Sequence, residues 1–179
     1  MSTLSVNTIT PETGNTVSLA SGKSLNASQG FTPPAGHVIQ VLTTGTIAST
    51  SNTSTNWAST NYTLNITPTS ANSKIYVAFS NHMRINGSGS PIRGGIRLRR
   101  EINGGSAAYI WNSDGSGETM QVRNADNEHD TPAYVGVLDS PSTTGVLTYT
   151  IQTKLLTGGY ILTYDSAKGG NIVLMEISG

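Results

Sequence analysis

The sequence contains no cysteine. Disulfide bonds, thiolate catalysis and cysteine-ligated zinc are therefore excluded. Because small secreted eukaryotic domains often carry disulfides, this absence favours synthesis in the cytoplasm of a bacterium. The opening residues, Met1–Ser5, have neither the basic region nor the apolar region of a signal peptide, so we expect no secretory signal.

Charge is scarce and balanced. Charged residues make up 11% of the chain, and ten basic residues offset ten acidic ones. A chain of this kind has no general electrostatic attraction to nucleic acid or to an anionic membrane. No run approaches the roughly 20 apolar residues of a membrane-spanning helix. The sequence therefore predicts neither a nucleic-acid partner nor membrane insertion.

Motifs for catalysis and metal binding are also missing. The sequence has no Gly-x-Ser-x-Gly and no His-Glu-x-x-His, and its three histidines are isolated. The acidic stretch Asp126–Asp130 lacks the spacing of a calcium loop, and we expect it to be a solvated loop. We therefore expect no enzyme, no cofactor and no metal site. A glycosidase site with two paired carboxylates stays an open alternative, since the distance between two carboxylates cannot be read from the sequence.

Aromatic residues amount to 6% of the chain, with two phenylalanines and seven tyrosines. A buried tyrosine hydroxyl needs a polar partner, so this balance favours half-exposed sheet faces and subunit seams. We expect part of the apolar surface to be buried between copies. A closed homotrimer is the favoured assembly.

Glycine, serine, threonine and asparagine supply 82 of the 179 residues. From His37 onward, apolar residues alternate in short runs, and no helical period competes with them. In the run 73–85 we expect the alternation to slip after Phe79 before Met83 and Ile85 continue it. The predicted strands are 37–43, 62–67, 73–85, 96–99, 107–111, 118–123, 133–138, 146–155, 160–164 and 172–177. This pattern predicts an all-β head over residues 37–179, a β-sandwich or jelly roll, with a long loop or irregular edge at 44–61.

Residues 1–36 differ from the head in composition. They are polar and punctuated by glycine and proline, and they hold too few apolar residues for a core of their own. Two adjacent prolines, Pro33 and Pro34, predict a stiff, extended hinge before the head. We expect a leader that docks on other proteins, either as short strands or as an unstructured tail.

Several short sequence words resemble those of known proteins. They are Met1–Ile9 with Thr13–Asn15, Pro34–Val41, Ser73–Ile75, Arg97–Arg100, Leu138–Pro141, Leu147–Tyr149 and Leu174–Ile177. Together they resemble short tail-fibre-like proteins of marine and freshwater bacteriophages, including cyanophages. The resemblance implies a trimeric head, similar in outline to complement-type and tumour-necrosis-factor-like jelly rolls, and an N-terminal segment that attaches to the virion. The chain has no long shaft, which indicates a stubby fibre or spike.

Arginines gather in one stretch of the chain. Five of the six lie within 17 residues, and Arg97 and Arg99 share one sheet face because strand side chains alternate. Such a stripe suits the phosphate or carboxylate groups of a bacterial surface glycan, although pairing with acids such as Glu101 is the favoured interpretation. An exposed tryptophan can stack on a sugar ring, and core or seam burial is equally compatible with the sequence. The candidate residues for a glycan-binding surface or a subunit seam are Arg84, Arg93, Arg97, Arg99, Trp57 and Trp111.

These observations favour a virion structural protein, a short tail fibre or spike that attaches to the host surface. The expected partners are two further copies of the chain, other virion proteins bound through residues 1–36, and a host surface glycan. A capsid decoration protein is the second hypothesis. A glycan-degrading tailspike enzyme is the third.

Overall fold

We analysed a computed structural model of the chain. The structure describes residues 21–22, 33–87, 92–110, 120–124, 128–157, 159–163 and 170–179, and the side chains of 120–124 and 162 are outside the description. The chain divides into two compact units, Met1–Thr32 and Pro33–Gly179. Of the first unit, only the turn at Ser21 and Gly22 belongs to the described residues.

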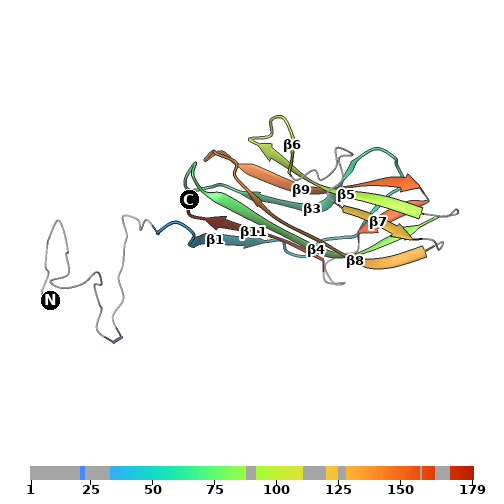
Figure 1. Ribbon diagram of the computed structural model, residues 1–179, viewed down its shortest axis with the longest axis horizontal. Helices are drawn as coiled ribbons and strands as arrows, with labels where there is room; N and C mark the ends of the chain where they lie inside the picture. The colour runs from blue at the N-terminus through green and yellow to red at the C-terminus, as the bar shows by residue number, and fades with distance from the viewer. Residues whose placement is uncertain are drawn as a thin grey trace, which may run out of the picture. The chain divides into compact units, whose positions relative to one another are not determined.

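Every regular element among the described residues is a β-strand (Figure 1). The strands are β1 (Val38–Thr43), β2 (Thr50–Asn52), β3 (Ala58–Ile66), β4 (Lys74–Asn86), β5 (Ile92–Ile102), β6 (Ala108–Ile110), β7 (Met120–Asn124), β8 (Glu128–Asp139), β9 (Leu147–Thr157), β10 (Tyr160–Thr163) and β11 (Asn171–Ile177). The predicted all-β sandwich is confirmed.

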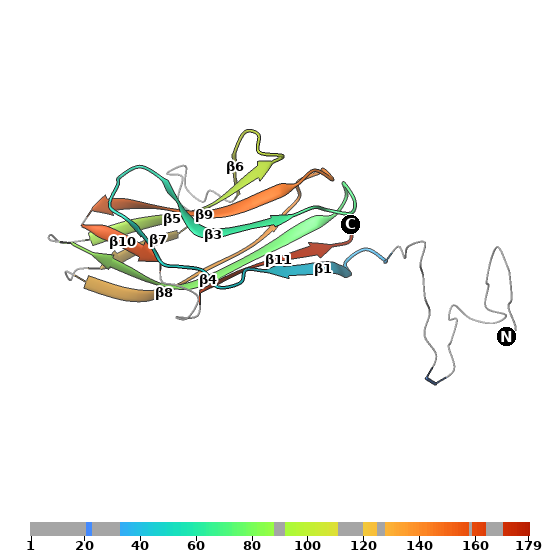
Figure 2. The same ribbon diagram turned by 180° about the vertical axis from the view of Figure 1, so that it is seen from behind.

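The strands form two antiparallel sheets that pack face to face (Figures 1 and 2). In sheet A, the long strand β4 pairs with β8 on one edge and with β11 and β10 in succession on the other; β1 then pairs with β11, and β2 with β10. In sheet B, β5 pairs with β9 on one edge and with β6 and β7 on the other, and β3 pairs with β9.

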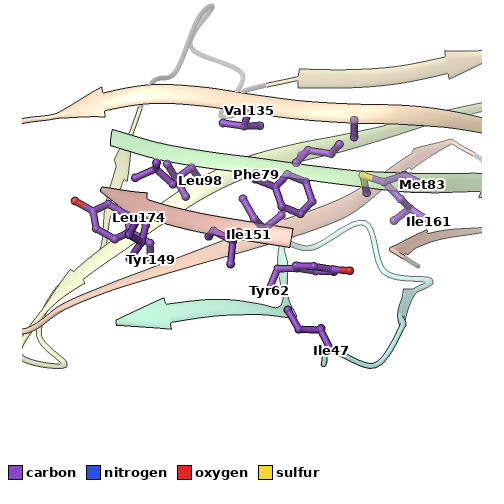
Figure 3. Close-up of a cluster of buried hydrophobic side chains, with 14 of the residues drawn as sticks. Ile47, Tyr62, Phe79, Met83, Leu98, Val135, Tyr149, Ile151, Ile161 and Leu174 are labelled. Carbon is purple, nitrogen blue, oxygen red and sulfur yellow. The ribbon is translucent and has the colours of Figure 1, made fainter. Parts of the chain in front are cut away.

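The two sheets enclose one hydrophobic core (Figure 3). Phe79 and Leu174 from sheet A and Ile151 from sheet B are fully buried there. The sheets lie close together at Gly94 of β5, where an added Cβ would lie 2.6 Å from Cδ1 of Ile161 on the opposite sheet. One copy of the head therefore buries a continuous core by itself.

The predicted slip in the alternation of β4 is wrong. Odd-numbered residues of β4 face the core throughout, and Asn81 takes the inward position between Phe79 and Met83. Its side-chain amide donates a hydrogen bond of 2.8 Å to the hydroxyl of Tyr62 on β3. A polar residue with a buried partner interrupted the apolar pattern without changing the phase of the strand.

The expectation that tyrosines lie mainly on sheet faces needs a correction for two of them. Tyr62 and Tyr149 are fully buried and are the largest side chains of the core. Asn81 satisfies the hydroxyl of Tyr62, and Asp139 accepts a hydrogen bond of 2.6 Å from that of Tyr149. Sequence alternation could not reveal these partners, because they come from the opposite sheet.

The head begins slightly before the predicted boundary at residue 37. The amide of Gly36 donates to the carbonyl of Ser178 at 2.7 Å, and the amide of Ser178 donates to the carbonyl of His37 at 2.8 Å. The hydroxyl of Ser178 also donates to the carbonyl of Pro33 at 3.2 Å. These bonds extend the pairing of β1 with β11 and join Pro33 to the end of the sandwich.

Candidate functional site

The arginine stripe divides between the two sheets. Arg84 of β4 lies on the outer face of sheet A and pairs with Glu128 at 3.0 Å and with Asp130 at 2.7 Å. Arg99 pairs with Glu101 at 2.6 Å. These contacts bear out the predicted acid pairing for two of the candidate arginines.

Arg100 is also paired, but inside the sandwich. Its guanidinium contacts both carboxylate oxygens of Asp139, at 2.8 and 2.6 Å, and Asp139 also accepts the hydrogen bond from Tyr149. The side chains of Arg100 and Asp139 are 14% and 9% exposed. Burial, followed by the hydrogen bond to Asp139, raises the pKa of Tyr149 above its ordinary range. This group joins β5, β8 and β9 and is structural.

Arg97 has a different environment, on the outer face of sheet B. Its guanidinium carbon lies 4.2 Å from the ring centroid of Trp57 and 3.8 Å from that of Tyr109. Its Nε–H donates to the side-chain oxygen of Gln152 at 2.8 Å. The ammonium of Lys154 lies 4.8 Å from the Trp57 ring. We name Trp57, Arg97, Tyr109, Gln152 and Lys154 the Arg97 platform.

The register of sheet B brings the Arg97 platform together. Arg97 on β5 is directly opposite Gln152 on β9, and Lys154 is two residues further along the same face of β9. Trp57 directly precedes β3 on one side, whereas Tyr109 lies on β6 at the other edge of β5. The two rings therefore reach Arg97 from opposite sides.

The described part of this face is strongly basic. It carries Arg93, Arg97, Arg99 and Lys154 against a single carboxylate, Glu101, which Arg99 already contacts. No ion pair among the described residues includes Arg93 or Arg97. Burial lowers the pKa of Arg97; Tyr109 offsets part of this effect and the charge of Arg99 adds to it. The platform thus holds a cation whose charge the described acids leave uncompensated.

One part of the outer face of sheet A is apolar. Val41, Met175, Tyr76 and Leu138 are consecutive partners across β1, β11, β4 and β8. Val41 is 54% exposed and Leu138 is 50% exposed. We name these four residues the sheet A row.

Two tyrosine hydroxyls extend the sheet A row along the same face. The hydroxyls of Tyr76 and Tyr134 are 2.8 Å apart and hydrogen-bonded. Both rest over Gly136, where an added Cβ would lie 2.6 Å from the Tyr134 hydroxyl and 2.9 Å from that of Tyr76. The absence of a side chain at Gly136 lets the tyrosines lie flat, so the face stays even.

A buried carboxylate fastens β1 and β11 to the loop that follows β3. Glu176 accepts hydrogen bonds from the side chain of Gln40 at 2.6 Å and from the amide and hydroxyl of Thr69, both at 2.7 Å. Burial raises the pKa of Glu176, but its hydrogen-bond donors, Gln40 and Thr69 among them, outweigh burial and hold the pKa below its ordinary value. Three hydrogen bonds thus favour the ionised form of Glu176.

The predicted acidic loop at 126–130 is partly wrong. Residues 128–130 open strand β8, and Glu128 and Asp130 pair with Arg84, while 126 and 127 lie outside the described residues. The pairing with β4 was invisible in the sequence, which showed only a dense run of polar side chains. Within the described ranges, no three histidine or acidic side chains gather in a way that could hold a metal ion.

Sequence reasoning selected Arg97 and Trp57 separately, and the structure joins them. It missed Tyr109, Gln152 and Lys154, whose contribution depends on strand register. Trp111, another candidate, lies outside the described residues. Arg93 lies on the same strand face as Arg97, and its Nε is buried without a hydrogen-bond partner among the described residues.

Comparison with known proteins gives no relative: no protein-family model and no curated protein matches the chain. In the portion of the chain that the structure describes, no helix has the length and apolar character needed to cross a membrane.

Proposed function

We propose that the chain is a bacteriophage virion protein, a short tail fibre or spike whose head contacts the host surface. Residues 1–36 attach the chain to the particle, and the head associates with two further copies. The sequence words shared with tail-fibre-like proteins support the virion assignment. The sheet A row is the observation that carries the association, because it places the exposed Val41 and Leu138, with the half-buried Met175 and Tyr76 between them, across the outer face of a folded β-sandwich.

We further infer that the head is a jelly roll. The strands alternate between the sheets along the chain: β1 and β2 belong to sheet A, β3 to sheet B, β4 to A, β5–β7 to B, β8 to A, β9 to B, and β10 and β11 to A. Some strands occupy one position in a sheet between them: β6 and β7 both pair with the same edge of β5, β10 and β11 both pair with the same edge of β4, and β1 and β2 lie outside β11 and β10. Counted in this way, each sheet has four strand positions. Two antiparallel sheets of four positions with this alternation are typical of jelly rolls.

The sheet A row suits contact with another copy of the same face better than permanent exposure to water. In a threefold assembly, each copy contributes the row to a common interior, while sheet B stays accessible. Weak binding to the host surface then gains from multivalency, since three heads and several fibres act on one cell.

Sedimentation velocity of the purified protein at micromolar concentration tests the association. We expect three times the mass of one chain, and we expect Leu138→Arg to sediment as a single chain with an unchanged circular dichroism spectrum. Asn65→Arg introduces the same charge on the exposed outer face of sheet B and should leave the mass unchanged. A folded wild-type protein that sediments as one chain would overturn the trimer.

Antibody labelling of particles of the phage that encodes the chain tests the location. We expect label on the tail, at a few dozen copies per particle or fewer. Label covering the shell at hundreds of copies would replace the tail assignment with a capsid decoration protein. Release of reducing ends from host polysaccharide would instead establish an enzyme.

A further inference from the structure

We propose that the Arg97 platform binds a carboxylated saccharide, the uronic-acid class of acidic surface glycan. The proposal deepens the proposed function, on which it rests for the natural source of the ligand. Its own basis is the geometry of the platform.

The platform presents a cation that is already fixed in place. Stacking on Trp57 and Tyr109 and the hydrogen bond to Gln152 restrain the guanidinium of Arg97 before any ligand arrives. A restrained side chain loses less conformational entropy on binding. A planar guanidinium also matches a carboxylate, with two parallel N–H···O bonds. The platform is therefore organised for a planar anion.

Charge complementarity selects an anionic ligand. On the described outer face of sheet B, Arg99 holds the carboxylate of Glu101, and no described ion pair includes Arg97. A fully compensated structural cluster has its acids close by, as Arg84 and Arg100 do. No described acid pairs with Arg97, and the carboxylate of a bound ligand would complement its charge.

The surroundings of Arg97 favour a saccharide over other anions. Tyr109 is 48% exposed and offers an aromatic surface to the apolar C–H groups of a sugar ring. On the same face, Thr63 of β3 is exposed and offers a polar group to sugar hydroxyls, and it donates a hydrogen bond of 3.2 Å to the buried hydroxyl of Thr150. A nucleic acid needs several phosphate-binding cations along a track, and the chain has a net charge of zero.

Isothermal titration calorimetry on the full chain tests this proposal with three oligomeric probes of similar length. The probes are oligogalacturonate, a neutral galactose oligomer and inorganic polyphosphate. We expect binding of oligogalacturonate, none of the neutral oligomer, and at least tenfold weaker binding of polyphosphate. Arg97→Gln should weaken oligogalacturonate binding by about tenfold or more, as expected for loss of a hydrogen bond between charged groups.

Two variants separate geometry from charge. Lys74→Gln removes the same charge from an exposed position on sheet A and should leave affinity unchanged. Arg97→Lys keeps the charge but loses the planar fork, and we expect it to weaken oligogalacturonate binding nearly as much as Arg97→Gln. If Arg97→Lys binds like the wild type, or if polyphosphate binds as tightly as oligogalacturonate, the platform is only a basic patch and the proposal fails.

The result is independent of the association test. If the protein is a trimer that does not bind oligogalacturonate, the ligand assignment is overturned and the fibre proposal stands. A single chain that binds the probe through Arg97 overturns the trimer and leaves the ligand assignment standing.

Discussion

Removing the carboxylate of Asp139 should destabilise the head more than any change of an exposed charge. Asp139 accepts two contacts from Arg100 and one from Tyr149, and all three side chains are largely buried. In Asp139→Ala, a guanidinium and a tyrosine hydroxyl lose their partner without gaining water. The substitution therefore leaves two buried polar groups without their hydrogen-bond acceptor.

The expected cost follows from two contributions. Breaking a buried ion pair by deleting one member costs about 3–5 kcal/mol. A buried hydroxyl left without an acceptor costs about 1–3 kcal/mol. Both losses share one carboxylate and are not additive, so we expect a total of about 4 kcal/mol in the free energy of unfolding. That is a large part of the about 5–15 kcal/mol that stabilises a typical domain.

Urea unfolding followed by tryptophan fluorescence measures this cost. All variants are compared at one protein concentration, because association adds to apparent stability. The matched control is Asp130→Ala, which breaks an exposed pair with Arg84 and should cost about 0–1 kcal/mol. If Asp139→Ala is no more destabilising than Asp130→Ala, then Asp139 is not holding the sheets together and the reasoning is refuted.

Three further predictions concern other buried groups. Glu176 has a lowered pKa, so it stabilises the fold at pH values above its ordinary pKa of 4.5 and loses this contribution as the pH falls below that value. Glu176→Gln should therefore flatten the dependence of the unfolding free energy on pH between about pH 6 and about pH 3. An unchanged dependence would contradict this. Tyr149 has a raised pKa, so its contribution to stability is complete at pH values below its ordinary pKa of 10 and decreases at higher pH. Tyr149→Phe should therefore make the midpoint of urea unfolding less sensitive to alkaline pH. Equal sensitivity in both proteins would count against this prediction. A Cβ added at Gly170 would collide with the hydroxyl of Tyr62 and the amide of Asn81; Gly170→Ala should therefore cost about 1–3 kcal/mol in urea unfolding, and a stable variant would show that this corner adapts.

Strand existence was readable from the sequence because the alternation of apolar residues reflects one buried face. The segments 73–85 and 146–155 match β4 and β9 closely for this reason. The region 44–61, expected to be a long loop or irregular edge, contains β2 and the start of β3. These short elements are rich in serine, threonine and asparagine, whose pairing in a sheet leaves no apolar pattern.

The candidate site was predictable by residue type and not by arrangement. Arg97 and Trp57 stood out as a clustered arginine and one of two tryptophans, but they are 40 positions apart in sequence. Their contact depends on β9 lying between β3 and β5, which no local pattern encodes. Arg97 and Arg99 looked equivalent on one face, but Arg99 pairs with Glu101, whereas Arg97 pairs with no acid among the described residues.

The pairing of β1 with β11 has a mechanical consequence. The two strands are antiparallel, and hydrogen bonds between Gly36, His37 and Ser178 continue their ladder to the end of the head where β1 begins. Tension applied along β1 from residue 36 acts parallel to the strands, so it loads all the bonds of the ladder in shear at the same moment. A force that peels β1 away from β11 would instead break these hydrogen bonds one at a time. A tether at this end can therefore pull on the head without opening it from its edge, and the rate of forced unfolding is set by the rupture of the whole ladder.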